Sequence, residues 1–249
     1  MLRFKLIGLG NRGLNTLKRF QDIPQDLAVF TQLEDISPAS VEAARSLCPY
    51  TISNEPYDAA YICTDWASHA SIAIAEMESG HDVVVEVPAA VTLEECQALC
   101  QTSLRTGRRC LMAENCCFDA FHLACLEIAR QGLFGTLTHL EGAYIHTIGM
   151  GDDATKPWMI NALRSTAGNS YPTHAYGPIA QLLALDGDSF TVVKSLSSTL
   201  TTGLNTALLR TKRGRSVLLQ LDVSTPRPYS RMQRASHRNT PSPPSTCAV

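Results

Sequence analysis

The most constraining feature of this sequence is the regular alternation of apolar runs and helix-like segments over its first 135 residues. The run RFKLI (3–7) ends in Gly8-Leu9-Gly10-Asn11-Arg12-Gly13, and a helix-like segment, LNTLKRF (14–20), follows at once. The same order recurs with apolar runs at 26–34, 58–64, 82–87 and 109–114, and with helix-like segments at 37–47, 68–80, 92–107 and 119–135. Nearly continuous apolar strands that alternate with helices favour a parallel sheet covered on both faces. We therefore expect an α/β fold with a doubly wound sheet.

The pattern changes after about residue 135. A strand-like segment at 137–147 and a helix near 172–185 are followed by strand-like runs at 190–200, 205–212 and 215–224. Lys212-Arg213-Gly214 is typical of a hairpin turn between the last two runs. We therefore expect an α+β domain over 136–231 with a mostly antiparallel open sheet. Residues 232–249 are rich in Pro, Ser and Arg and lack an apolar period, which predicts a disordered tail.

Composition excludes several classes of protein. The chain has 249 residues, of which 45% are hydrophobic, and a net charge of −2, so nucleic acid and anionic membranes are not expected partners. No run reaches the roughly 18 apolar residues of a membrane span, and MLRFKLIGLG resembles a first strand more than a signal peptide. The cysteines are typical of reduced thiols in a cytoplasmic protein. Cys96 and Cys100 lack a nearby partner set, so we expect no metal ion.

The first glycine turn has the context that a dinucleotide-binding turn requires, with a strand before it and a helix after it. The amides of residues 10–13 would donate hydrogen bonds to a pyrophosphate at the positive end of that helix. Asp35 lies 22 residues after Gly13, where a carboxylate can bind ribose hydroxyls and repel a 2′-phosphate. The pattern predicts a Rossmann domain over 1–135 that binds NAD. Arg12 leaves NADP open, and an ordinary tight turn is the simpler alternative.

Further motifs carry a family resemblance. The segment YICTDWASHASIAIAEMESGHDVVVEVPAAVTLEECQAL (61–99) closely resembles Gfo/Idh/MocA-type oxidoreductases. Its Glu86-Val87-Pro88 replaces the Glu-Lys-Pro of sugar dehydrogenases, and the missing Lys argues against a plain dehydrogenase. Together with MAENCCFDAFH (112–122), GAYIH (142–146), GNSYPTHAYGPIA (168–180) and PRPYSR (226–231), it is similar to the glycoside hydrolase family 109 branch, NAD-dependent enzymes typified by α-N-acetylgalactosaminidase.

This resemblance implies an activity and a set of site residues. The implied reaction is glycoside hydrolysis by transient oxidation at the sugar C3, elimination, water addition and re-reduction, with NAD bound tightly and not consumed. The residues implied at the cofactor are Gly8, Gly10, Asn11, Arg12, Gly13, Asp35, Trp66, Ser68, His69, Glu86, Val87 and Asn115. Those implied at the sugar are Tyr144, Tyr171, Pro172, Thr173, His174 and Tyr229. His174 would shuttle a proton, and Tyr144 and Tyr171 would act as acids or as donors to an oxyanion.

Several of these residues also have simpler structural explanations. His69 could cap a helix, and Pro172 and Thr173 suit a helix start. The three tyrosines could be packing residues of a strand, a loop and a sheet edge.

The chain also departs from the family pattern. Met159 follows Trp158 where the family usually has an Arg that contacts the sugar, and a thioether cannot make that forked contact. Thr147 stands where the family tends to have Asp, and the loop 147–157 looks shortened. The resemblance ends near residue 231, so we expect a C-terminally truncated second domain with an exposed sheet edge, and hence a less stable or inactive chain.

Three functions therefore stay open at this point. They are an NAD-dependent glycosidase, an NAD(P)-dependent sugar or cyclitol dehydrogenase, and an inactive NAD-binding homologue. We expect a carbohydrate substrate, and a homo-oligomer that assembles through the sheet of the second domain.

Overall fold

The chain folds into two compact units, Met1–Ala113 and Glu114–Val249. The computed structural model describes residues 1–48, 53–147, 157–165 and 168–238. The predicted boundary after residue 135 is wrong, because helix α5 (Ala120–Arg130) belongs to the second unit. Leu126 of α5 lies in the second core, and His122 bonds to Gln181 of a later helix across 2.7 Å.

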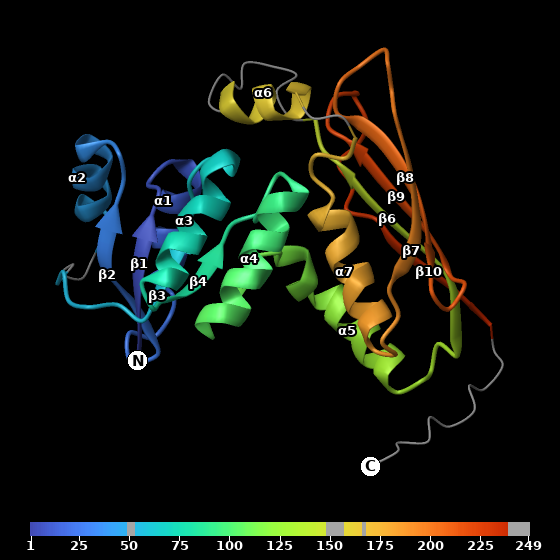
Figure 1. Ribbon diagram of the computed structural model, residues 1–249, viewed down its shortest axis with the longest axis horizontal. Coiled ribbons are helices and arrows are strands. Elements are labelled where there is room, and N and C mark those ends of the chain that lie inside the picture. Colours follow the sequence, from blue (N-terminus) through green and yellow to red (C-terminus); the bar gives the residue numbers. More distant parts are fainter. Residues whose placement is uncertain (49–52, 148–156, 166–167, 239–249) are drawn as a thin grey trace. The chain divides into compact units, whose positions relative to one another are not determined.

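The first unit is a five-stranded parallel sheet in the order β2-β1-β3-β4-β5. Figure 1 labels β1 to β4 of this sheet. Its strands are β1 (Leu2–Ile7), β2 (Ala28–Glu34), β3 (Ala59–Ile62), β4 (Asp82–Val85) and β5 (Cys110–Met112). The helices are α1 (Asn11–Phe20), α2 (Pro38–Ser46), α3 (Trp66–Glu78) and α4 (Leu93–Thr106). The predicted doubly wound parallel sheet is confirmed.

Both faces of this sheet are buried, as its nearly continuous apolar strands require. Leu6 packs on one face with Leu17 of α1 and Ala44 of α2. On the other face, Ile62 and Val83 pack with helix α3 and with Leu99 of α4. The strand ends are thereby held firmly enough to fix the turns that follow them.

The second unit is built on a five-stranded sheet in the order β10-β6-β9-β8-β7. Its strands are β6 (Thr136–Ile145), β7 (Phe190–Ser197), β8 (Leu204–Thr211), β9 (Ser216–Asp222) and β10 (Gln233–Arg238). Among the described strands of this sheet, only the β6–β9 pair is parallel. The predicted mostly antiparallel sheet is therefore confirmed, as is the hairpin turn, where the amide of Gly214 bonds to the carbonyl of Thr211 across 3.0 Å.

Helices α5 and α7 (Thr173–Ala184) cover one face of the second sheet (Figure 1). Ile179 and Leu183 of α7 pack there on Leu140, Val217 and Leu219 of the sheet. A 3₁₀ helix, η1 (Asn115–Phe118), and helix α6 (Pro157–Ser165) complete the described elements.

The predicted disordered tail is wrong for residues 233–238. These residues form β10, which pairs antiparallel with β6 from Gln233 opposite Gly142 to Arg238 opposite Thr136. Residues 239–249, the rest of the predicted tail, lie outside the described residues. Within the described part of the chain, no helix has the length and apolar character needed to cross a membrane.

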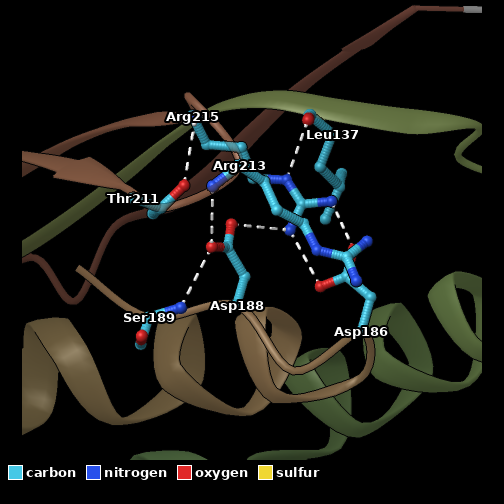
Figure 2. Close-up of polar contacts among 7 residues, drawn as sticks. All are labelled: Leu137, Asp186, Asp188, Ser189, Thr211, Arg213 and Arg215. Atoms are coloured by element: carbon cyan, nitrogen blue, oxygen red, sulfur yellow. Dashed lines mark hydrogen bonds and ion pairs between the residues drawn. The ribbon is translucent and has the colours of Figure 1, made fainter. Parts of the chain in front are cut away.

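A buried ion network joins the turn after α7 to the β8–β9 hairpin (Figure 2). Arg215 Nη1 donates to Asp186 across 2.9 Å and to Asp188 across 3.0 Å, and its Nε donates to the carbonyl of Leu137 across 3.1 Å. The Asp188 side chain is 0% exposed. Removal of one partner from such a network leaves a buried charge without compensation.

Arg215→Met is therefore expected to lower the free energy of unfolding by about 3 kcal/mol. Arg213→Met is the matched control, because the Arg213 side chain is 56% exposed in its 3.4 Å pair with Asp186, and exposed pairs contribute less than about 1 kcal/mol. Urea denaturation of both variants checks the difference. Equal stability of the two variants would contradict a structural role for the buried pair.

The same network predicts that the free energy of unfolding falls at low pH. Hydrogen bonding to Arg215 lowers the pKa of Asp186. Burial opposes ionisation of Asp188, but hydrogen bonds from Thr211 and from the amides of Arg213 and Ser189 outweigh it and lower its pKa. Both folded-state values lie below the ordinary 3.8, so the stabilisation is fully present above that value and is lost as the pH falls through the folded-state values. The difference in free energy of unfolding between wild type and Arg215→Met should therefore become smaller in strong acid.

Candidate functional site

The glycine turn after β1 has two glycines that the packing requires and one that it does not. A Cβ on Gly8, where φ is +90°, would lie 2.7 Å from the carbonyl carbon of Cys63, and a Cβ on Gly13 would lie 1.9 Å from the oxygen of Gly8. A Cβ on Gly10 would meet nothing within 4 Å among the described residues. The turn thus keeps open backbone at Gly10, which is the space that a pyrophosphate needs in order to approach the amides.

Helix α1 presents its first turn to that open space. It begins at Asn11 after Gly10, and within the described chain neither a side-chain cap nor an acidic residue occupies its first turn. The amides there carry the partial positive charge that binds anions. The residues present therefore fit the phosphates of a dinucleotide.

Asp35 is held beside this turn at the end of β2. Its Oδ2 accepts a hydrogen bond from the amide of Leu9 at 2.6 Å, and its Oδ1 accepts one from the amide of Ser37 at 2.8 Å. Each carboxylate oxygen keeps a further lone pair for a hydroxyl group. These backbone hydrogen bonds thus hold the Asp35 carboxylate, which is predicted to bind the ribose, next to the glycine turn.

The remaining cofactor predictions lie at the starts of α3 and η1 and after β4. Asp65 caps α3 by accepting from the amide of Ser68 across 3.1 Å, and Trp66 is buried in the same turn. Glu86 follows β4, and its carboxylate lies 3.7 Å from the guanidinium of Arg12. Val87 comes next and is buried. Asn115 begins η1 and belongs to the second unit.

The His69 side chain makes contacts that hold the fold together. The side chain is 1% exposed, with Nδ1 lying 2.8 Å from the carbonyl of Pro88 and Nε2 lying 3.1 Å from the carbonyl of Thr64. The ring therefore ties the start of α3 to the segment after β4. This role is a third possibility beside helix capping and ligand contact, and contact with the cofactor stays a prediction.

In the second unit, a close approach of α7 to β6 gathers the predicted sugar-site residues. A Cβ on Gly142 would lie 2.3 Å from the carbonyl oxygen of Ala175, so only glycine lets the first turn of α7 lie on the strand at this point. The His174 ring then lies 4.7 Å from the Tyr144 ring and 4.8 Å from the Tyr171 ring, both edge to face. All three residues are buried.

His146 and Tyr229 extend this aromatic cluster. Tyr144 Oη lies 3.0 Å from His146 Nδ1, and the His146 ring lies 5.1 Å from the Tyr229 ring. Tyr229 is 57% exposed, so the cluster runs from buried His174 towards the surface. Pro172 and Thr173 begin α7 as predicted.

Glu114 holds His174 in place. Its Oε1 lies 2.7 Å from His174 Nδ1 and also accepts from the amide of Cys116 at 3.0 Å. Burial opposes ionisation of Glu114, but the hydrogen bonds from His174 and Cys116 outweigh it and lower its pKa. The carboxylate fixes the imidazole through Nδ1, which leaves Nε2 to exchange a proton.

Cys116 lies beside this pair but is not an activated nucleophile. Burial raises the pKa of its thiol to about 12, even though Arg231 Nη1 donates to its sulfur across 3.4 Å. A thiol that stays protonated is a poor nucleophile. The arrangement therefore supports proton transfer at His174 rather than thiol chemistry.

Sequence reasoning missed Glu114, Cys116 and His146 as site residues. The spacing of two between Tyr144 and His146 on a strand places both side chains on one face, so that signal was present for His146. No local signal pairs Glu114 with His174, because the two residues are 60 positions apart.

The structure also places the residues that depart from the family pattern. Met159 is buried in α6, and Trp158 before it is partly exposed. Thr147 Oγ1 donates to the carbonyl of Thr225 across 3.1 Å. Residues 148–156 of the loop predicted to be shortened lie outside the described residues.

The fold and the glycine turn together define a Rossmann-type nucleotide-binding unit followed by a second, α+β unit. Residues 2–114 match the family model described as an oxidoreductase family with an NAD-binding Rossmann fold. Residues 119–206 match the C-terminal domain of glycosyl hydrolase 109.

Comparisons that cover most of this chain agree with the two domain matches. The chain is 36% identical to an alpha-N-acetylgalactosaminidase of Bacteroides fragilis, in an alignment that covers 93% of this chain and 65% of that protein. It is 34% identical to glycosyl hydrolase family 109 protein 2 of Phocaeicola vulgatus, with 94% of this chain and 68% of that protein covered. The chain belongs to glycosyl hydrolase family 109. It spans about two thirds of the length of these relatives.

A solved structure supports the fold. The WlbA dehydrogenase of Bordetella pertussis, in complex with NADH and UDP-GlcNAcA, superposes with a TM-score of 0.76 at 20% identity, over 90% of this chain and 68% of that chain. At this identity the likeness concerns the fold alone.

Proposed function

We propose that this chain is an NAD-dependent glycoside hydrolase that acts on alpha-N-acetylgalactosaminides or related sugars. The observation that carries the proposal is the buried Glu114–His174 pair, set among Tyr144 and Tyr171 in a chain that is 36% identical to an alpha-N-acetylgalactosaminidase. The pair supplies a positioned proton-transfer group. The two-carboxylate arrangement of most glycosidases is not needed by enzymes that use NAD in this way.

When bound, NAD would supply the reversible oxidation and reduction of a sugar carbon, while the chain positions both molecules and moves protons. The amides of the glycine turn and the Asp35 carboxylate would hold the cofactor. His174 Nε2 would take a proton from the sugar and return it, since Glu114 holds the other ring nitrogen. The phenols of Tyr144 and Tyr171 would donate to oxygens on which negative charge develops.

One assay tests this function against its alternatives. The full chain is incubated with p-nitrophenyl alpha-N-acetylgalactosaminide, with and without added NAD⁺, and nitrophenol and net NADH are both followed. Nitrophenol release without net NADH is the expected result. Net NADH from a free sugar would instead identify a dehydrogenase. NAD binding with neither product would identify an inactive homologue.

Asp35 is expected to set the preference for NAD over NADP. Asp35→Ser should weaken NAD binding roughly 10-fold, because the lost hydrogen bonds are to a charged acceptor. It should also reduce the difference in affinity between NAD and NADP, because the carboxylate that repels the 2′-phosphate is removed. Glu34→Gln is the matched control, since this neighbouring carboxylate pairs with Lys5 at 2.7 Å. Calorimetric titration with both nucleotides provides the measurement. An unchanged NAD affinity in Asp35→Ser would remove Asp35 from the site.

A further inference from the structure

The cluster around Glu114 contains a third side chain that the proposed reaction does not use. Glu114, Cys116 and His174 each offer one donor atom, and these atoms all lie within 4.8 Å of one another in buried positions. Carboxylate, thiolate and imidazole are the three side-chain groups that bind Zn²⁺. Two of the ligands come from the segment at η1 and one from the first turn of α7, so they form no short sequence motif.

We propose that Glu114, Cys116 and His174 form a binding site for a thiophilic divalent cation, for which Zn²⁺ is the best match. Three protein ligands leave one position of a tetrahedral site for a water molecule. The inference goes beyond the proposed function, because cation binding requires neither NAD nor a sugar.

An unpaired oxygen in the cluster supports the proposal independently. Oε2 of Glu114 is buried and makes no hydrogen bond within the described chain, while Oε1 receives both available donors. The hydroxyl of Thr173, next to His174 in the chain, is also buried and makes no hydrogen bond within the described residues. A buried carboxylate oxygen without a partner is costly, and a cation would supply that partner.

The charges around the cluster balance a divalent ion. The Glu114 carboxylate and a Cys116 thiolate together offset two positive charges. Arg231 adds a positive charge next to the sulfur, but Asp119 lies 3.3 Å from the Arg231 guanidinium and compensates it. The hydrogen bond from Arg231 to the sulfur partly offsets the burial that keeps the free thiol protonated, and a bound cation would displace the thiol proton.

Binding is a ligand exchange without redox change. The metal forms bonds to sulfur, oxygen and nitrogen, the thiol S–H bond breaks, and its proton passes to solvent. The imidazole binds as a neutral ring with its proton on the other nitrogen. Where the proposed function holds, an ion on His174 also blocks its proton transfer and inhibits the reaction.

Cobalt titration of the full chain tests the site without any activity measurement. Tetrahedral Co²⁺ bound to thiolate gives a near-ultraviolet charge-transfer band, and Zn²⁺ should displace it. The background is Cys96→Ser/Cys100→Ser, which removes two exposed thiols on α4. We expect one equivalent of Co²⁺ to saturate the band. Cys116→Ser should abolish the band and weaken binding at least about 10-fold, whereas Cys117→Ser, at the adjacent buried thiol, should leave both unchanged.

His174→Gln gives a second test that keeps all thiols of that background. It should weaken Co²⁺ binding at least about 10-fold while far-ultraviolet circular dichroism stays that of the parent. Absence of a charge-transfer band at millimolar Co²⁺ would overturn the proposal. A band that survives in Cys116→Ser, or that is lost in Cys117→Ser alone, would overturn it as well.

Discussion

His174→Ala is expected to reduce glycoside cleavage by roughly 100- to 10,000-fold, the range that general acid–base groups contribute. NAD affinity should stay within about 2-fold, since a lost proton-transfer group changes the transition state rather than cofactor binding. His174 lies in the second compact unit, whereas the predicted cofactor residues other than Asn115 lie in the first. The measurements are nitrophenol release and calorimetric titration with NAD⁺.

His122→Ala controls for loss of a buried histidine. His122 is buried in the same unit, but its Nε2 lies 2.7 Å from Gln181 rather than against Glu114. We expect this variant to lose stability and to keep its turnover at temperatures where it is folded. Equal loss of turnover in both variants, or loss of NAD binding in His174→Ala, would refute the assigned role of His174.

The alternation of strands and helices in the first unit was predictable because each signal is local. Apolar strands, glycines after them and caps such as Thr92 with Glu95 are all readable within a few residues. Helix α5 gave the same local signals as the helices before it. Its assignment to the second unit depends on the contacts of Leu126 and His122 with distant residues, which no local pattern contains.

Strand β10 was missed for a different reason. Its residues Gln233–Arg238 are polar apart from Ala235, and most of them are exposed. The strand is fixed mainly by backbone pairing with β6. Sheet pairing of this kind depends on the partner strand and not on the segment's own pattern.

The candidate site, like the fold, was predictable where its signals are local. The motif around His174 was identified from the sequence, and the structure adds the carboxylate that orients it. The approach of α7 to Gly142 brings Glu114, His174 and Tyr144 together from three separate segments. Contacts of this kind arise from tertiary packing, which explains why Glu114 and Cys116 were not predicted as site residues.

Gly13→Ala is expected to destabilise the first unit by roughly 4 kcal/mol or more, an exceptional value for one methyl group. The new Cβ would lie 1.9 Å from the carbonyl oxygen of Gly8. Gly8 has little room to move aside, because it packs so closely on the next strand that a Cβ built on it would lie 2.7 Å from the carbonyl carbon of Cys63. Urea denaturation should show the loss of stability, and NAD binding should be lost with the fold of the turn.

Gly10→Ala separates folding from binding at the same turn. Its Cβ meets nothing within 4 Å in the described residues and its φ is −70°, so the cost to stability should be less than about 1 kcal/mol. A methyl group there would nevertheless occupy the space through which a pyrophosphate approaches the amides, so NAD affinity should fall at least about 10-fold. Wild-type NAD affinity in Gly10→Ala would mean that the turn is only a tight turn. Weaker NAD binding with unchanged stability would distinguish a phosphate site from that simpler alternative. A methyl group that touches none of the described residues can weaken binding only by excluding the ligand.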